Sequence, residues 1–235
     1  MAIENSLTGS ILPNYVLLQR FQLHIQGEIY LRIKQNLMAL PGQELSDIHT
    51  VRSHPIALEQ CSDFLSETPQ INCIESFDTA ESAREIRESN LLGAAAIASA
   101  LAAQIYKLTI LAASIENVKQ NYTRFLVLTA DDQNTETSAN KASLSFHVSH
   151  EVGALADILN IFRDHAINLG LIQSVPIPGR PDEYTFHVDV EWQDRNKFEQ
   201  AMEKVRRGAK ELTILGEYRA GLRPSQLEAC PQTAR

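Results

Sequence analysis

The sequence has little cysteine, few aromatic side chains and no long apolar run. Its three cysteines (Cys61, Cys73 and Cys230) form no C-x-x-C pair and no metal-ligand spacing, so we expect neither a disulfide framework nor a metal site. The most apolar stretch, residues 91–103, is too short and too interrupted by glycine and serine to span a bilayer. Residues 1–10 have no basic segment followed by an apolar run, so no signal peptide is expected. These absences predict a cytoplasmic protein with no membrane partner.

Basic side chains are also in the minority. Twenty-one Lys and Arg residues stand against 29 Asp and Glu residues, a formal net charge of −8, and this balance predicts no nucleic-acid partner. The sequence contains no G-x-G-x-x-G, P-loop, G-x-S-x-G or H-E-x-x-H motif. The absence of these motifs leaves two kinds of function for this chain of 235 residues: chemistry that needs no cofactor, and binding. With 44% apolar side chains, this chain can build one large domain or two ordinary ones.

A polar stretch divides the chain. Residues 131–140, DDQNTETSAN, include no large apolar side chain and therefore predict a linker. It separates a first module, residues 1–130, from a second, residues 141–222. Residues 223–235 are polar again and predict a flexible tail.

The second module has a regular order of elements. Alternating apolar residues predict strands at 144–148, 167–177, 184–190 and 212–215. Gly153 opens a helix with apolar residues at helical spacing, and Asp194 begins another. The order βαββαβ predicts an antiparallel sheet with two helices on one face. The other face is polar or free for a partner, and it includes Ser145, His147, Thr185 and His187.

The first module alternates helices with short apolar runs, which predict strands at 71–74, 94–98, 108–111 and 125–128. Ser53 is followed by Pro55 after one residue, a pattern typical of a helix N-terminus with Ser53 as its cap. Asp78 or Thr79 caps the next helix and Ser99 a third. Strands separated by helices of this length predict a mostly parallel α/β sheet.

Three polar clusters interrupt the apolar patterns: Asn5 with Ser6, Ser53 with Gln60, and residues 121–125. Gln60 follows Ser53 by seven residues, nearly two helical turns, so the two side chains can face the same side. Each cluster also has a local explanation as turn residues, a helix cap or a strand entry. Together the clusters supply amide, hydroxyl and guanidinium donors, which suit a ligand rich in carboxylates.

Four segments in this order resemble the motifs of the prephenate dehydratase family: AIENSLTGS, VRSHPIALEQC, GAAAIAS and NYTRFLVL. The following module, with GALADIL and NLGLIQSVPIPGRPDEYTFHVDVE, resembles the regulatory ACT domain of that family. The resemblance implies an α/β fold like that of type II periplasmic binding proteins, with two lobes and an active site between them. A βαββαβ ferredoxin-like ACT domain follows.

The family reaction removes carbon dioxide and water from prephenate to give phenylpyruvate, on the route to phenylalanine, and it implies no metal or organic cofactor. Because aromatisation of the ring drives the reaction, the enzyme has to position prephenate and help its hydroxyl leave. By this resemblance Thr123 acts on the leaving hydroxyl, while Arg124 adjusts the local field. The implied substrate-binding residues are Asn5, Ser6, Ser53, Gln60, Arg124 and Phe125.

In the ACT module the resemblance implies phenylalanine as the effector. Gly153, Ala154 and Leu155 match the G-A-L motif of the effector site. The second effector motif of the family reads E-S-R-P, whereas this sequence has Gln173, Ser174, Val175 and Pro176. Two charged positions have become neutral, so weaker binding of phenylalanine is expected. The resemblance also implies a homodimer or homotetramer formed through the ACT domains.

The family places a strand, a glycine-rich turn and a helix ahead of its first motif, whereas this sequence begins almost at that motif. We therefore expect an incomplete first lobe with an open sheet edge and apolar faces without cover. No helical chorismate mutase segment is present in the sequence. Two other classes of function stay open: a non-catalytic amino-acid-binding or interaction protein, and a small-molecule-binding protein of the periplasmic type. The missing signal peptide disfavours the second of these.

Overall fold

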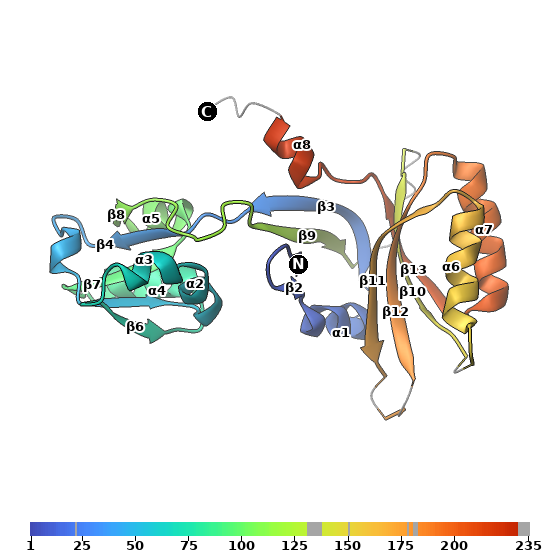
Figure 1. Cartoon of the computed structure of the whole chain (residues 1–235), viewed down its shortest axis with the longest axis horizontal. Helices are drawn as coiled ribbons and strands as arrows, with labels where there is room; N and C mark the ends of the chain where they lie inside the picture. The colour runs from blue at the N-terminus through green and yellow to red at the C-terminus, as the bar shows by residue number, and fades with distance from the viewer. Residues whose placement is uncertain (22, 131–137, 150, 178, 181–182, 230–235) are drawn as a thin grey trace. The chain divides into compact units, whose positions relative to one another are not determined.

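The computed structural model describes residues 1–21, 23–130, 138–149, 151–177, 179–180 and 183–229. Contacts divide the chain into two compact units (Figure 1). The first joins Met1–Leu31 to Tyr122–Arg235, and the second is Arg32–Asn121. Most of the predicted linker, residues 131–137, lies outside the described residues, and the domain boundaries stay a prediction.

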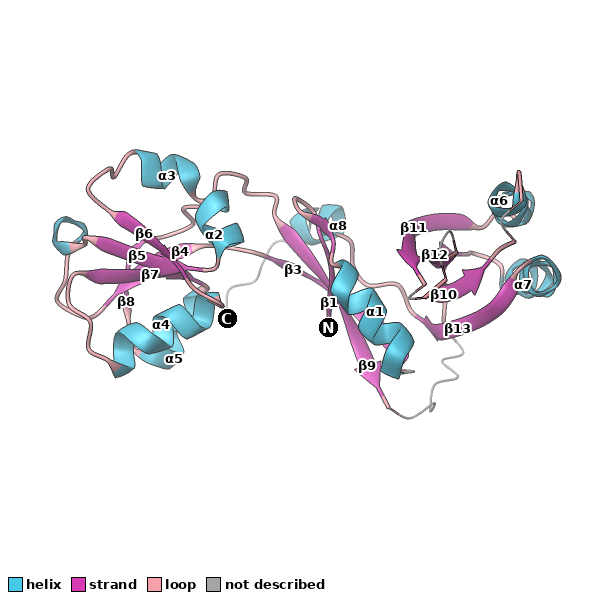
Figure 2. Cartoon of the chain, turned by 90° about the horizontal axis from the view of Figure 1, so that it is seen from below, coloured by secondary structure: helices cyan, strands magenta, loops and turns pink. Residues whose placement is uncertain are grey.

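The second unit is a five-stranded sheet with helices on both faces (Figure 2). The strand order is β6-β5-β7-β4-β8. The strands are β4 (Asn36–Ala39), β5 (Thr50–Ser53), β6 (Asn72–Glu75), β7 (Ala94–Ala98) and β8 (Thr109–Ala112). The helices are η1 (Leu45–Asp47), α2 (Pro55–Gln60), α3 (Ser62–Ser66), α4 (Thr79–Glu88) and α5 (Ala100–Tyr106).

The central strands of this sheet are buried on both faces, because alternate residues point into two different cores. Leu37 and Ile97 pack in one core with residues of α2 and α3. Met38 and Ala96 pack in the other with residues of α4 and α5. The predicted strands at 71–74, 94–98 and 108–111 are all present, each within one residue of its expected range.

Four of the five strands of this unit run in the same direction, as predicted for a mostly parallel sheet, and β4 is the exception. β5 pairs parallel with β6 and β7, but β4 pairs antiparallel with both β7 and β8. β7 and β8 therefore run in the same direction, joined by α5, and β4 lies between them in the opposite direction. A helix between two strands indicates their direction, but it does not show which other strand enters between them.

The first unit contains two four-stranded sheets. The order of the first is β2-β1-β9-β3. Its strands are β1 (Ala2–Asn5), β2 (Gly9–Ser10), β3 (His24–Arg32) and β9 (Tyr122–Thr129). β1 runs antiparallel to β9, with Asn5 opposite Thr123. Helix α1 (Leu12–Phe21) follows β2, and the sequence patterns did not predict it.

The second sheet of this unit confirms the βαββαβ order. Its strands follow the order β11-β12-β10-β13, and all three pairs are antiparallel. The strands are β10 (Lys141–His147), β11 (Asn168–Pro176), β12 (Tyr184–Glu191) and β13 (Lys210–Tyr218). Helices α6 (Ala154–Asp164) and α7 (Arg195–Gly208) lie side by side on one face (Figure 1). Asp194 caps α7, as predicted.

The opposite face of this sheet is covered by the N-terminal part of the chain, so the expectation of a face free for a partner is wrong. Ser145, Thr185 and His187 are buried. The ring of Tyr15 on α1 meets the ring of His187 edge-on, with ring centroids 5.1 Å apart. Tyr15 and Leu18, three residues apart on one side of α1, join a core with residues from both sheets.

Several apolar side chains of the first unit are exposed. They lie on α1 and on β3, an edge strand of its sheet, and are Leu12, Val16, Phe21, Ile29 and Leu31. We expected apolar faces without cover in this region, and that expectation stays a prediction.

The segment predicted as a flexible tail contains helix α8 (Pro224–Ala229), while residues 230–235 lie outside the described residues. None of the helices in the described part of the chain is long and apolar enough to cross a membrane.

His187 makes the stability of the first unit sensitive to acid. Burial lowers the pKa of His187 from 6.5 to about 4; Asp189 opposes this shift and His147 adds to it. The unfolded chain therefore takes up the proton first, and stability falls as the pH drops from about 6.5 towards 4. At about pH 4.5 we expect His187 to cost roughly 2 to 3 kcal/mol of unfolding free energy.

Urea unfolding at pH 7 and at about pH 4.5, followed by the fluorescence of the single tryptophan, Trp192, measures this effect. Trp192 is buried in the core of the first unit, so its emission reports on that unit. His187→Phe keeps an aromatic ring beside Tyr15 and removes the titrating group, so it should lose less stability on acidification than the wild type. Equal losses in the two proteins would assign the acid sensitivity to other groups.

Candidate active site

The predicted catalytic threonine sits in a two-residue polar pair on neighbouring strands. Thr123 is the second residue of β9, and Asn5 is the last residue of β1. Their pairing across the sheet lets the Asn5 amide nitrogen donate to Thr123 Oγ1 at 3.0 Å. Both side chains are largely buried, so water competes little for this hydrogen bond.

A tight turn after β1 fixes the orientation of Asn5. Its side-chain oxygen accepts from the backbone nitrogens of Leu7 and Thr8, at 3.0 and 3.1 Å. With the amide oxygen held in this way, the amide NH2 group must point towards β9. Ser6, which is exposed, accepts a hydrogen bond from the Tyr122 nitrogen at 2.9 Å and ties the same turn to β9.

The geometry leaves the Thr123 hydroxyl suited to donate its proton. A hydroxyl carries one donor and two acceptor positions, and Asn5 occupies an acceptor position. A threonine hydroxyl is a poor acid by itself. The N–H of Asn5 counteracts this weakness, because it stabilises negative charge that develops on Oγ1 as the proton leaves.

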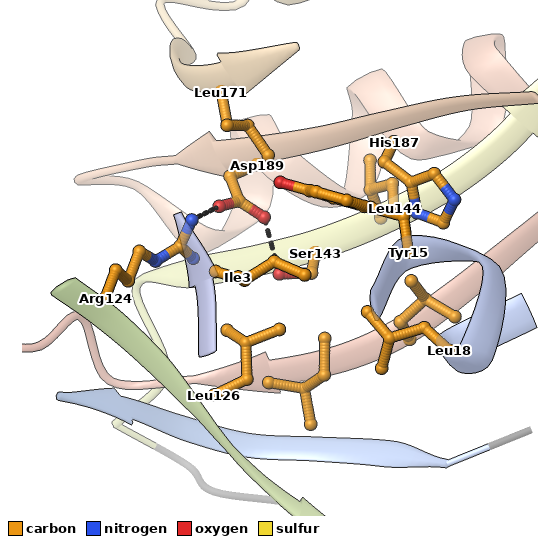
Figure 3. A pocket seen from close by; sticks show the side chains of 12 residues that line it. Ile3, Tyr15, Leu18, Arg124, Leu126, Ser143, Leu144, Leu171, His187 and Asp189 are labelled. Atoms are coloured by element: carbon orange, nitrogen blue, oxygen red, sulfur yellow. Dashed lines mark hydrogen bonds and ion pairs between the residues drawn. The ribbon is translucent and has the colours of Figure 1, made fainter. Parts of the chain in front are cut away.

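Arg124 belongs to a different environment from the one the sequence led us to expect. Its guanidinium group lies in a buried ion cluster, formed by Glu28, Arg124, Lys141, Asp189 and Glu191, and its role in substrate binding stays a prediction. Arg124 Nε lies 2.6 Å from Glu28 and Nη1 lies 2.5 Å from Asp189. Figure 3 shows Arg124 reaching Asp189, which in turn accepts from Ser143.

The ion cluster accounts for the electrostatics of Arg124. Burial alone would lower the pKa of Arg124, but the nearby groups, with Asp189 first, raise it above its ordinary value. Arg124 is 3% exposed, and successive residues of a strand point to opposite faces. Arg124 and Thr123 therefore project from β9 in opposite directions. Phe125, on the same side as Thr123, is half-buried.

The second unit carries the other predicted polar residues. Ser53 is not a helix cap: it is the last residue of β5, fully buried, and its hydroxyl donates to the Ile97 carbonyl of β7 at 2.7 Å. His54 caps α2 instead, and Pro55 occupies the first helical position as predicted. Ser53 and Gln60 therefore do not share a helix.

Gln60, the last residue of α2, has a partner, Asn121, to which the sequence analysis assigned no role. The buried Asn121 side chain donates to Gln60 Oε1 at 3.1 Å. The backbone oxygen of Gln60 also accepts from Asn117 at 2.7 Å. Asn121 therefore anchors the end of α2, and the only sequence sign of this was its place at the start of the NYTRF segment.

The predicted effector residues lie at the start of α6 and at the end of β11. Gly153 is the N-cap of α6, with a φ of 89°, a conformation that favours glycine. Ala154 and Leu155 begin the helix and are half-buried. A cavity of about 360 Å³ opens beside them, with Leu155, Tyr184 and Phe186 in its lining.

On β11, Gln173 and Ser174 are partly or fully exposed, and Gln173 Nε2 donates to the Ser174 carbonyl at 2.8 Å. Val175 is different. It is 3% exposed and packs in the core beside α1, so the structure gives it a packing role. Pro176 is exposed at the strand end.

Among the described residues, no group of three or more His, Cys, Asp or Glu side chains could hold a metal ion. Cys61 also offers no reactive thiol, because burial raises its pKa to about 12, with Glu116 adding to the shift. The side chains that the structure brings together at Thr123 are an amide and a hydroxyl.

These features define an α/β protein with an attached ACT-type βαββαβ module and a threonine–asparagine pair on neighbouring strands. Residues 1–133 match the family model described as prephenate dehydratase. The match covers more than half of the 235 residues, and the chain belongs to the prephenate dehydratase family.

Curated relatives agree with this assignment. The bifunctional chorismate mutase/prephenate dehydratase of Enterobacter agglomerans is 33% identical over 221 residues, which cover 93% of this chain and 57% of that protein. Arogenate dehydratase/prephenate dehydratase 2, chloroplastic, of Arabidopsis thaliana is 37% identical over 229 residues, with 93% and 60% covered. The chain thus spans less than two thirds of the length of these relatives.

Solved structures share the fold. A protein described as GqqA, a novel type of quorum quenching acylase, has a TM-score of 0.85 at 29% identity, covering 94% of this chain and 81% of its own. The prephenate dehydratase of Arthrobacter aurescens in complex with L-Phe has a TM-score of 0.83 at 28% identity, covering 96% and 74%. The fold, with its periplasmic-binding-protein-like and ACT parts, is confirmed.

Proposed function

We propose that this chain catalyses the decarboxylating dehydration of prephenate to phenylpyruvate. The observation that carries the proposal is the Asn5–Thr123 pair, in which a hydroxyl keeps its proton to donate and an amide supports the charge left behind. Membership of the prephenate dehydratase family supports the choice of prephenate as the substrate on which this pair acts.

The proposed chemistry balances without a cofactor. The ring carboxylate of prephenate leaves as carbon dioxide, and the electrons of the broken C–C bond enter the ring. The C–O bond to the ring hydroxyl breaks, and the leaving hydroxide takes a proton from Thr123 Oγ1 to become water. Solvent returns the proton to Oγ1. Aromatisation drives the step, so Thr123 has to supply only one well-placed proton.

The other site residues divide into binding and supporting roles in this proposal. In the first unit, Ser6 offers its hydroxyl group to the substrate, Phe125 packs beside it and Asn5 supports Thr123. The roles of Ser53 and Gln60, which belong to the second unit, stay predictions.

The direct test is formation of phenylpyruvate from prephenate by the purified chain, followed by its absorbance and by release of carbon dioxide. A folded protein that binds prephenate in calorimetry but releases no phenylpyruvate would favour the non-catalytic binding protein instead. The acylase among the structural neighbours does not supply a second candidate. Thr123 Oγ1 accepts from an amide here, and a nucleophilic hydroxyl needs a general base as its partner.

We further infer that phenylalanine is the effector and that it binds at residues 153–155 and 173–176. The neighbouring solved prephenate dehydratase holds L-Phe, which supports this choice of ligand. Pairing of ACT-type sheets into a homodimer or homotetramer is part of the same proposal, and light scattering at tens of micromolar tests it. A monomer at that concentration would contradict the association.

Gln173→Glu is expected to tighten the binding of phenylalanine. The amide oxygen of Gln173 can accept from the ammonium group of the ligand, but a carboxylate makes a charge-assisted hydrogen bond, stronger by about 1 kcal/mol, or several-fold in Kd. Isothermal titration with L-phenylalanine measures the difference. Gln104→Glu adds the same charge at an exposed position of α5 and should leave the affinity unchanged. An unchanged Kd for Gln173→Glu would remove residue 173 from the effector site.

A further inference from the structure

The buried ion cluster connects the strand of the catalytic threonine to the C-terminal sheet. Arg124, on β9, contacts Glu28 of β3, Asp189 of β12 and, at 3.2 Å through Nη2, the Tyr218 hydroxyl of β13. Lys141 of β10 lies 2.9 Å from Glu28 and 3.2 Å from Glu191. One guanidinium group thus joins strands of both sheets of the first unit.

The cluster is built to hold its members in a fixed geometry. The side chains of Glu28, Arg124, Lys141 and Asp189 are all 5% exposed or less, so an ion that loses its partner cannot turn to water. Neutral groups complete the coordination: Ser143 donates to Asp189 at 2.5 Å and shares a 2.8 Å hydrogen bond with Tyr218. The forked guanidinium group gives Arg124 direction as well as charge.

Thr123 precedes Arg124 directly in β9. Because the two side chains project to opposite faces, Arg124 cannot contact a substrate held at the Thr123 hydroxyl. It does determine where the backbone of residue 124 lies, and the Thr123 carbonyl is part of the same peptide unit. The connection continues into β11, because two residues of β12 pair with it: Asp189 pairs with Leu171, and His187 pairs with Gln173. The segment 173–176 is therefore held to the strand that carries Asp189.

We propose that Arg124 is a positioning residue: through its ion pair with Asp189 it ties β9 to the C-terminal sheet and so holds Thr123 in its reactive position. The C-terminal sheet is thereby part of the catalytic support, in addition to any effector role. The inference rests on the proposed dehydration for its effect on rate, but the tie between β9 and β12 is measured without it.

Asp189→Asn is the main test, because it removes the charge and keeps the shape. For phenylpyruvate formation we expect kcat to fall roughly tenfold with KM within about threefold, since prephenate itself does not contact residue 189. In hydrogen–deuterium exchange we expect faster exchange in residues 122–129, with β4 and β7 unchanged. Glu217→Gln is the matched control, because it breaks an outer ion pair of the same sheet, with Arg195 on α7, and should change neither readout.

Tyr218→Phe is the second variant, should Asp189→Asn fold poorly. It removes one hydrogen bond to Arg124 and leaves every charge in place, so a smaller fall in kcat, of roughly twofold to threefold, is expected. A general loss of stability would instead speed exchange equally in β9, β10 and β13 and leave the kcat of the folded fraction unchanged. That result, or unchanged exchange in residues 122–129, would overturn the inference.

The two proposals fail in different ways. If the wild-type chain forms no phenylpyruvate, the proposed function fails, and the exchange of β9 in Asp189→Asn still decides whether the ion pair holds this strand. If the wild type is active and Asp189→Asn retains kcat within twofold, the proposed function survives and the positioning role does not.

Discussion

Thr123→Ala is expected to lower the turnover of prephenate by roughly 100-fold or more, the range for loss of a positioned proton donor. The alanine removes the hydroxyl that Asn5 supports at 3.0 Å, and the leaving hydroxide must then take its proton from water. KM should change little, because one hydroxyl contributes only a small part of the binding of a dicarboxylate. Steady-state phenylpyruvate formation at saturating prephenate measures the effect.

Thr123→Ser is the control for this experiment, since it keeps the hydroxyl and removes only a methyl group. Its turnover should stay well above that of Thr123→Ala. Asn5→Ala should fall between the two, because the hydroxyl remains but loses the N–H that stabilises its charge. Activity of folded Thr123→Ala within a few-fold of the wild type would remove Thr123 from the chemistry.

The pairing of Asn5 with Thr123 shows what the sequence could reveal about the site and what it could not. The residue types and their order indicated that both belong to one polar set, and the resemblance to the family gave Thr123 its role. The distance depends on β1 and β9 being neighbours, although Asn5 and Thr123 are 118 positions apart in the sequence. No local pattern contains that information, because strand pairing is decided by the whole sheet.

Arg124 shows a different limit. In the sequence it is a charged residue between two site residues, so a place in the substrate site was a natural interpretation. Its partners, Glu28 and Asp189, are far from it in the sequence, and no local pattern connects them with it. Ser53 was misread for a similar reason, because a serine before proline suits a helix cap but equally suits the end of a buried strand.

The C-terminal module was predicted most completely, because its alternating strands and amphipathic helices agree with one another over residues 141–218. Helix α1 was missed, since only Tyr15 and Leu18 are buried on it while several other apolar residues stay exposed. With so weak a periodic pattern, the helix depends on packing against the second sheet, which is tertiary information.

Glu28→Ala is expected to lower the unfolding free energy of the first unit by about 3 to 5 kcal/mol, the range for breaking a buried ion pair from one side. Glu28 accepts from Arg124 at 2.6 Å, from Lys141 at 2.9 and 3.0 Å, and from the Gly221 nitrogen at 3.0 Å. Alanine leaves two buried cations to share the carboxylates of Asp189 and Glu191 and leaves the Gly221 N–H without this acceptor. Urea unfolding at pH 7, followed by Trp192 fluorescence, measures the loss.

Glu199→Ala provides the comparison, since Glu199 pairs with Arg195 at 3.0 Å on the surface, where both side chains are about half exposed. Solvent screens that pair, so its removal should cost less than about 1 kcal/mol. A loss for Glu28→Ala as small as this would mean that water reaches Arg124 and Lys141 once the carboxylate is gone. The ion cluster would then be too loosely held to position β9, because a strand is fixed by buried charges only while those charges have no alternative partner.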